Sequence, residues 1–366
     1  MTKEGISDIL YSNELKFVRD GFDMKKKSNK LNLIICGIAF VIMVVFLFLD
    51  GIDNIFSAMQ SLNPLFLGLA VLCIVGYWFF EGFGLHMAAK SLEPDTKLKT
   101  SILVAMIGQY FNCITPCATG GQPMQVYTYV KHKMPLGSAM TALVARFIVY
   151  QFMLTLYSVV FLVFKLSMFT EGDLKGLTFL VIVGFIVNTA VIVMLFMLAF
   201  FRKATTKIAH GIVKLLGKIR IIKDAEEKIK YIDNELEQYY ENFLFIKKRP
   251  WLVIKMCLVT AVQLLLYFGI TYVIYLGFGM SGTDFFTIIA CQAFVLMISS
   301  FVPLPGAMGA AEGSYAAFFG GIFGDHYTVV STFIWRFLTF YLPILVGIIL
   351  NLSLSRKGID FEKMKD

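Results

Sequence analysis

Apolar residues run through this chain in long stretches, and most polar residues gather between them. A helix of about 20 mainly apolar residues is long enough to cross the hydrocarbon core of a bilayer. We therefore expect an all-α, polytopic membrane protein. The apolar stretches lie near 31–49, 64–89, 100–114, 136–164, 176–201, 251–279, 284–302 and 326–354.

Composition supports this assignment and excludes a soluble domain. Hydrophobic residues make up 58% of the 366 positions, charged residues only 16%, and the mean hydropathy is +0.74. The first apolar stretch, 31–49, is not followed by a small-residue cleavage site, so we expect it to remain as a helix rather than act as a signal peptide. The expected location is the cell membrane.

The positive charges predict the orientation. Almost all lysines and arginines fall in 1–30, 89–99, 131–133, 202–255 and 355–366. Basic residues favour the cytoplasmic side of a membrane protein, so both termini are predicted to be cytoplasmic. The segments 1–30 and 355–366 would then be cytoplasmic, as would the loop 202–250. The basic first half of this loop would lie on the anionic inner leaflet or form a solvated helical pair.

This charge pattern leaves too little chain for full crossings in 100–130. Lys99 and Lys131 should both be cytoplasmic, yet only about thirty residues separate them. A helix that crosses outward and a second that returns would together need about forty residues. Two half-helices that meet inside the membrane would satisfy both constraints. The sequence from Pro116 to Pro123 would form the break, so 100–130 is predicted to be a re-entrant hairpin.

A second hairpin is predicted at 284–323, where an apolar segment begins and ends on the outer side. Its middle, "FVPLPGAMGAAEG", contains two prolines and three glycines. Each break is followed after about thirty residues by one arginine within an apolar span, Arg146 and Arg336. The halves thus resemble an inverted repeat, a pattern that points to a transporter's binding site. Proline kinks in ordinary helices are the alternative.

Four ionisable side chains fall within apolar spans: Glu81, Arg146, Glu312 and Arg336. An arginine at the centre of a membrane helix costs about 2.5–3.5 kcal/mol on insertion scales, so such residues usually face a partner or a cavity. They could form two structural ion pairs. They could also form a cavity in which the arginines bind a phosphate, because guanidinium groups match phosphate oxygens.

Helix breaks also leave backbone N–H groups that can bind an anion, helped by the positive end of the helix dipole. We therefore expect the head group of a ligand at the breaks as well. The candidate residues are Asn112, Gly120, Gly121 and Gln122 at the first break, and Gly306 and Gly309 at the second. No metal ligand is predicted, since Cys113, Cys117 and His132 do not have a zinc-site spacing. No catalytic residue or cofactor site is predicted either.

The two hairpins resemble the flippase-like transmembrane family of lysylphosphatidylglycerol synthase. The first family motif is similar to Asn112-x3-Pro116-x3-Gly120-Gly121-x-Pro123 followed by Arg146. The second is similar to Pro305-Gly306-x2-Gly309-x2-Glu312 followed by Arg336, although Ala307 stands where the family often has glycine. The resemblance covers about 31–354.

This resemblance implies that the chain moves a phospholipid between leaflets, for example an aminoacylated phosphatidylglycerol such as lysylphosphatidylglycerol. Full-length synthases carry a cytosolic aminoacyl-transfer domain that the sequence after 354 does not resemble, so we expect a translocator and neither an enzyme nor a nucleic-acid-binding protein. A separate synthase would be a natural partner, and a homo-oligomer remains open. The alternatives are a membrane-embedded lipid-modifying enzyme and a small-solute secondary transporter.

Overall fold

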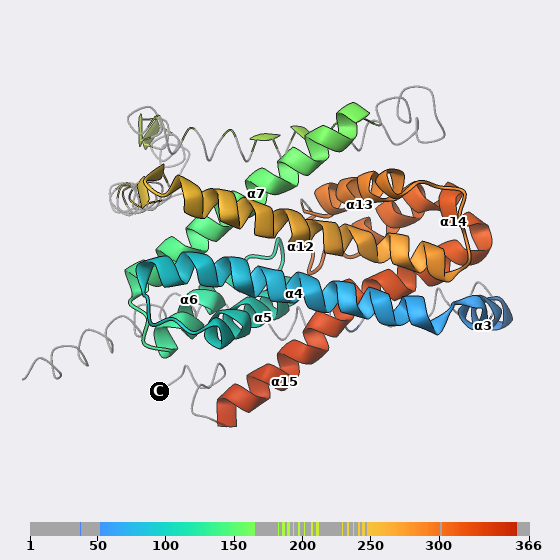
Figure 1. The fold of residues 1–366 in the computed structure, drawn as a ribbon, viewed down its shortest axis with the longest axis horizontal. Coiled ribbons are helices and arrows are strands. Elements are labelled where there is room, and N and C mark those ends of the chain that lie inside the picture. Colours follow the sequence, from blue (N-terminus) through green and yellow to red (C-terminus); the bar gives the residue numbers. More distant parts are fainter. Residues whose placement is uncertain are drawn as a thin grey trace, which may run out of the picture.

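The computed structural model describes residues 52–164, 247–300 and 302–356, together with isolated positions at 37 and between 182 and 245. Within these ranges every regular element is a helix, which confirms the all-α expectation (Figure 1). In chain order they are α3 (Ile52–Ser61), α4 (Pro64–Leu92), α5 (Leu98–Ile114), α6 (Gly121–Lys131), α7 (Leu136–Phe164), α12 (Pro250–Gly277), α13 (Phe285–Ser299), α14 (Ala310–Arg336), the π-helical turn η2 (Phe337–Tyr341) and α15 (Leu342–Arg356).

Several predicted segments lie wholly or largely outside the described residues. These are the cytoplasmic segments 1–30 and 355–366, the spans 31–49 and 176–201, and the loop 202–250. Their sidedness and their lipid contacts stay predictions.

Three helices, α4, α7 and α12, form the long frame of the molecule. They contain 29, 29 and 28 residues, so each is about 42–44 Å long at 1.5 Å per residue and exceeds the bilayer core. Helices α4 and α12 run side by side (Figure 1). Gly76 faces Leu266 across this contact, and a side chain at Gly76 would meet it. Small residues of this kind let membrane helices approach closely.

The first break predicted from the sequence separates α5 from α6. Helix α5 ends at Ile114, the backbone from 115 to 120 is not helical, and α6 starts at Gly121. The two helices pack against each other and have only 17 and 11 residues. At about 26 and 17 Å, neither reaches across a core of about 30 Å. The helical hairpin is therefore present, and its entry from the cytoplasmic side stays a prediction.

The second hairpin consists of α13 and the first part of α14, which also pack together. Helix α14 is bent at Gly324, where φ is +68° and ψ is 169°. The bend reverses the chain, because the rings of Tyr315 and Trp335 stack with their centroids 4.8 Å apart, whereas a straight helix would separate these residues by about 30 Å. The stretch Ala310–Asn351, which is apolar enough to span a membrane, thus comprises a hairpin arm and a separate final helix.

The tips of the two hairpins repeat each other residue by residue. In the first, Ala118 N donates to Thr115 O and Thr119 N to Pro116 O; in the second, Ala307 N donates to Leu304 O and Met308 N to Pro305 O. Each residue of the second tip follows its counterpart in the first tip by the same number of positions. An antiparallel bridge joins Pro116 to Pro305, so the tips touch inside the bundle. This geometry supports the internal repeat inferred from the prolines and arginines.

Candidate functional site

A cavity of about 740 Å³ lies where the two hairpin tips meet. Both halves of the repeat line it, since its walls include residues of α4, α5, α6, α7, α13 and α14. Six of the ten residues predicted to contact a ligand are in these walls: Glu81, Asn112, Gln122, Arg146, Gly306 and Arg336. Gly120, Gly121, Gly309 and Glu312 are not among the lining residues.

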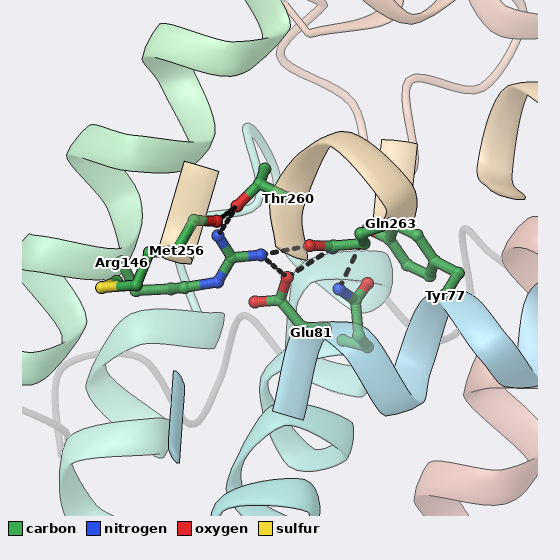
Figure 2. Close-up of polar contacts among 7 residues, drawn as sticks. Tyr77, Glu81, Arg146, Met256, Thr260 and Gln263 are labelled. Carbon is green, nitrogen blue, oxygen red and sulfur yellow. Dashed lines mark hydrogen bonds and ion pairs between the residues drawn. The ribbon is translucent and has the colours of Figure 1, made fainter. Parts of the chain in front are cut away.

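Arg146 is held by three side chains from two other long helices (Figure 2). Its Nη2 donates to Glu81 Oε2 on α4 at 2.8 Å and to Gln263 Oε1 on α12, and its Nη1 donates to Thr260 Oγ1 on α12 at 2.7 Å. Gln263 also donates from Nε2 to Glu81 Oε2 at 2.6 Å. The guanidinium and carboxylate thereby tie α4, α7 and α12 together.

This arrangement leaves Arg146 little freedom to bind a ligand. Its side chain is only 4% exposed, and its Nε is buried without a hydrogen-bond partner among the described residues. Gly84 lies beside it, where a Cβ atom would come within 3.1 Å of Nε. Buried charges are stable only when they are paired and hydrogen-bonded. In this structure Arg146 joins three helices at the edge of the cavity, and its predicted contact with a head group stays a prediction.

Arg336 is held differently and keeps unused donors. Its Nε donates to Glu312 Oε1 at 2.5 Å, and its Nη2 donates to the carbonyl oxygen of Gly306 at 2.8 Å. Its guanidinium carbon lies 4.6 Å from the ring centre of Phe340, consistent with a cation–π contact. Within the part of the chain that the structure describes, Nη1 makes no hydrogen bond, and Arg336 lines the cavity. The side chains of Arg146 and Arg336 are about equally buried, at 4% and 6% exposure, and they differ in that Arg336 keeps a terminal nitrogen, Nη1, without a hydrogen bond to any described residue.

The N–H groups at the breaks are less available than the sequence suggested. Gly120 N donates to Thr115 Oγ1 at 2.9 Å, and Gly309 N donates to Glu312 Oε2 at 2.7 Å. Glu312 therefore places its carboxylate at the positive end of α14, where an anionic ligand was expected. Glu312 also accepts a hydrogen bond from Arg336 and thereby orients this arginine, although it does not itself line the cavity.

Close packing explains most of the predicted glycines. A Cβ atom at Gly121 would collide with Asn112 Oδ1, and one at Gly306 would collide with the ring of Phe340. At Gly309, φ is +82°, a conformation that residues with side chains rarely adopt. These glycines shape the hairpins that carry the cavity.

The sequence did not identify all the polar residues of the site. It missed Thr260 and Gln263, the partners of Arg146, and Gln125 of the cavity wall, although a glutamine inside an apolar span such as "TAVQLLL" was a usable signal. Of the polar residues near the second break, Ser299 and Ser300 line the cavity. Gln292 instead accepts a hydrogen bond from Thr271 at 2.9 Å, fully buried between helices.

Comparisons with known proteins agree with the motifs in the hairpins. A family model described as "Lysylphosphatidylglycerol synthase TM region" matches residues 34–347. The chain is also 25% identical over 306 residues to a protein named "UPF0104 membrane protein" from Archaeoglobus fulgidus, covering 82% of this chain and 90% of that protein. The family match includes both hairpins and both arginines.

Proposed function

The chain belongs to the family of the lysylphosphatidylglycerol synthase transmembrane region, and from this premise we propose that it moves a phospholipid between the leaflets of a membrane. The observation that carries the proposal is the cavity between the two hairpins, with Arg336 on its wall. A cavity with charged and polar residues in its walls, inside an apolar helical bundle, gives a charged head group a path that avoids hydrocarbon, while the acyl chains stay in the lipid.

The size and chemistry of the cavity suit a phospholipid head group. Its volume of about 740 Å³ lies within the range of roughly 300–1,000 Å³ common for sites that bind small molecules. The unbonded Nη1 of Arg336 offers N–H donors to phosphate oxygens, for which guanidinium groups are well suited. Glu312 keeps the guanidinium in place and compensates its charge while the site is empty.

The repeat supports transport by alternating exposure of this site. In transporters built from inverted repeats, one half moves against the other around a site near the bilayer centre. Here the two halves meet at the tips, where Pro116 opposes Pro305. Separation of the tips on one side at a time would open the cavity to each leaflet in turn. In this proposal the hairpins enter the membrane from opposite sides.

We propose transport rather than group transfer for this site. A general base or nucleophile must be free to approach the reacting group. Glu81, a carboxylate in the cavity wall, accepts hydrogen bonds from Arg146 and Gln263 through Oε2, and the adjacent guanidinium favours its charged form and makes it a weaker base. A separate synthase would then supply any modified lipid that the chain carries.

Reconstitution of the purified chain in liposomes tests this proposal. Phospholipids with a fluorescent acyl chain are incorporated into both leaflets, and a membrane-impermeant quencher is added outside. Without protein, only the outer leaflet should lose fluorescence on the assay timescale. With the chain, we expect the inner-leaflet signal to decay as well. Decay no faster than in protein-free liposomes, for any phospholipid tested, would contradict the proposal.

A further inference from the structure

Four carboxamide side chains line one side of the cavity and are largely unused by the protein. We call this set the amide wall; it consists of Gln109 and Asn112 on α5 and Gln122 and Gln125 on α6. Gln109 donates to the hydroxyl of Tyr77 at 3.3 Å. Among the residues that the structure describes, Asn112, Gln122 and Gln125 make no hydrogen bond.

The fold makes room for the amide wall. The amide of Gln125 lies against Gly108, and Oδ1 of Asn112 lies against Gly121. A Cβ atom at either glycine would occupy the position of the amide group. Gln125 is 9% exposed, Asn112 is half-buried and Gln122 is exposed, and none of their amide atoms is among the fully buried polar atoms without a partner, so these amides are accessible from the cavity. Amides that line a cavity and make no hydrogen bond to the described part of the protein are open to a ligand or to water that completes their hydrogen bonds.

Amides select for particular ligand groups. Each carboxamide presents two N–H donors and one carbonyl acceptor. A hydroxyl group both donates and accepts, so it pairs with either end of an amide. An ammonium group donates only, and it would leave the amide N–H donors without acceptors. The amide wall therefore matches a head group rich in hydroxyls better than one that ends in an amine.

The charges around the cavity lead to the same conclusion. Both oxygens of Glu312 are engaged, one by Arg336 and one by Gly309 N. Glu81 lies next to Arg146 and accepts from it, so an ammonium group near Glu81 would also approach a guanidinium. Arg336, in contrast, retains donors for an anion. Arg336 thus offers a partner to a phosphate, whereas a cation that reached the unbonded Oε1 of Glu81 would also approach the guanidinium of Arg146.

We propose that the site selects an anionic phospholipid whose phosphodiester carries a neutral, hydroxyl-bearing group, such as glycerol or a sugar. Arg336 binds the phosphate, and the amide wall binds the hydroxyls. This inference rests on the proposed lipid transport and narrows its substrate. It differs from the expectation of an aminoacylated lipid, whose head group carries amines.

The test compares fluorescent lipids that share their acyl chains and differ only in the head group. Phosphatidylglycerol, phosphatidylethanolamine and lysylphosphatidylglycerol are assayed with the chain in the same liposomes. We expect phosphatidylglycerol to move about tenfold faster than either amine lipid, the effect of one or two lost hydrogen bonds. In the Asn112→Leu/Gln125→Leu double variant, the rate ratio should fall towards one. Gln60→Leu changes an exposed amide on α3 and should keep the ratio.

The outcomes separate this inference from the proposed function. Amine lipids moving as fast as phosphatidylglycerol, or a double variant that keeps the full ratio, would overturn the head-group assignment and leave lipid transport supported. Uptake of soluble glycerol 3-phosphate without lipid movement would overturn lipid transport and support the head-group chemistry. Neither lipid movement nor uptake would overturn both. Chromatographic elution and thermal unfolding of each variant show whether it is folded.

Discussion

Pro116 and Pro305 oppose each other in an antiparallel bridge, so two hairpins from distant parts of the sequence meet at their tips. Residues paired in this way have Cα atoms about 4.5–5.5 Å apart, within the range that a disulfide can span. The bridge therefore offers a direct test of whether the tips separate during transport.

The double variant Pro116→Cys/Pro305→Cys, with Cys113 and Cys117 replaced by serine, should form a disulfide under oxidation. We expect the oxidised protein to lose lipid transport and to regain it after reduction, because the cross-link prevents the tips from separating. Each single variant, treated in the same way, is the control. A quantitative cross-link that leaves the transport rate unchanged would show that the tips stay together.

Arg146 should matter more for stability than for ligand binding. Arg146→Ala leaves Glu81 and Gln263 without their shared donor, and loss of one partner of a buried ion pair costs about 3–5 kcal/mol. We expect a large decrease in the thermal unfolding temperature in detergent. The double variant Arg146→Met/Glu81→Gln should recover much of this loss, since no buried charge is left unpaired. An Arg146→Ala protein as stable as the wild type would refute the tie between α4, α7 and α12.

Arg336 should matter for transport. Arg336→Ala removes the donors that face the cavity, and we expect the flipping rate in liposomes to fall to that of protein-free membranes. Arg336→Lys should restore only part of the rate, because an ammonium replaces a planar, bidentate donor. The double variant Arg336→Ala/Glu312→Gln is the control, because it removes the arginine without leaving the Glu312 carboxylate unpaired. If this double variant transports normally, Arg336 does not bind the lipid.

Gly121 should be intolerant of any side chain. Gly121→Ala would push against Asn112 and the carbonyl oxygen of Gly108, and overpacking of this kind costs about 1–3 kcal/mol. Gly137→Ala, in a helix with no atom near the added Cβ, is the matched control and should be neutral or stabilising by up to about 1 kcal/mol. Thermal unfolding measures both. Equal effects at the two positions would argue against close packing between α5 and α6.

The sidedness of the hairpins is open to direct measurement. In a cysteine-free background, Lys133→Cys after α6 should react with impermeant thiol reagents only from the cytoplasm. Thr283→Cys, before α13, should react only from outside. Labelling of position 133 from outside alone would exclude a re-entrant first hairpin.

The sequence by itself determined where helices form and where they break. Long apolar runs are helical because a lipid-embedded backbone must satisfy its own hydrogen bonds. Helices α5 and α13 end shortly before Pro116 and Pro303, because proline disfavours helix in the residues before it. The breaks are shorter than the predicted 116–123 and 303–313, since Gly121 already begins α6 and Ala310 begins α14. The reversal at Gly324 falls just before the predicted final span, 326–354. Glycine suits this bend because it tolerates the positive φ found there.

Tertiary structure alone decided how the polar side chains are used. The sequence marked Arg146 and Arg336 as equivalent members of a repeat, yet Arg146 is bonded to Glu81, Thr260 and Gln263. Arg336 lines the same cavity and keeps its terminal Nη1 without a hydrogen bond among the described residues. Such differences depend on the rotation and crossing of helices from distant parts of the chain. These are set by packing over whole helix faces, and no local rule of spacing or propensity contains them.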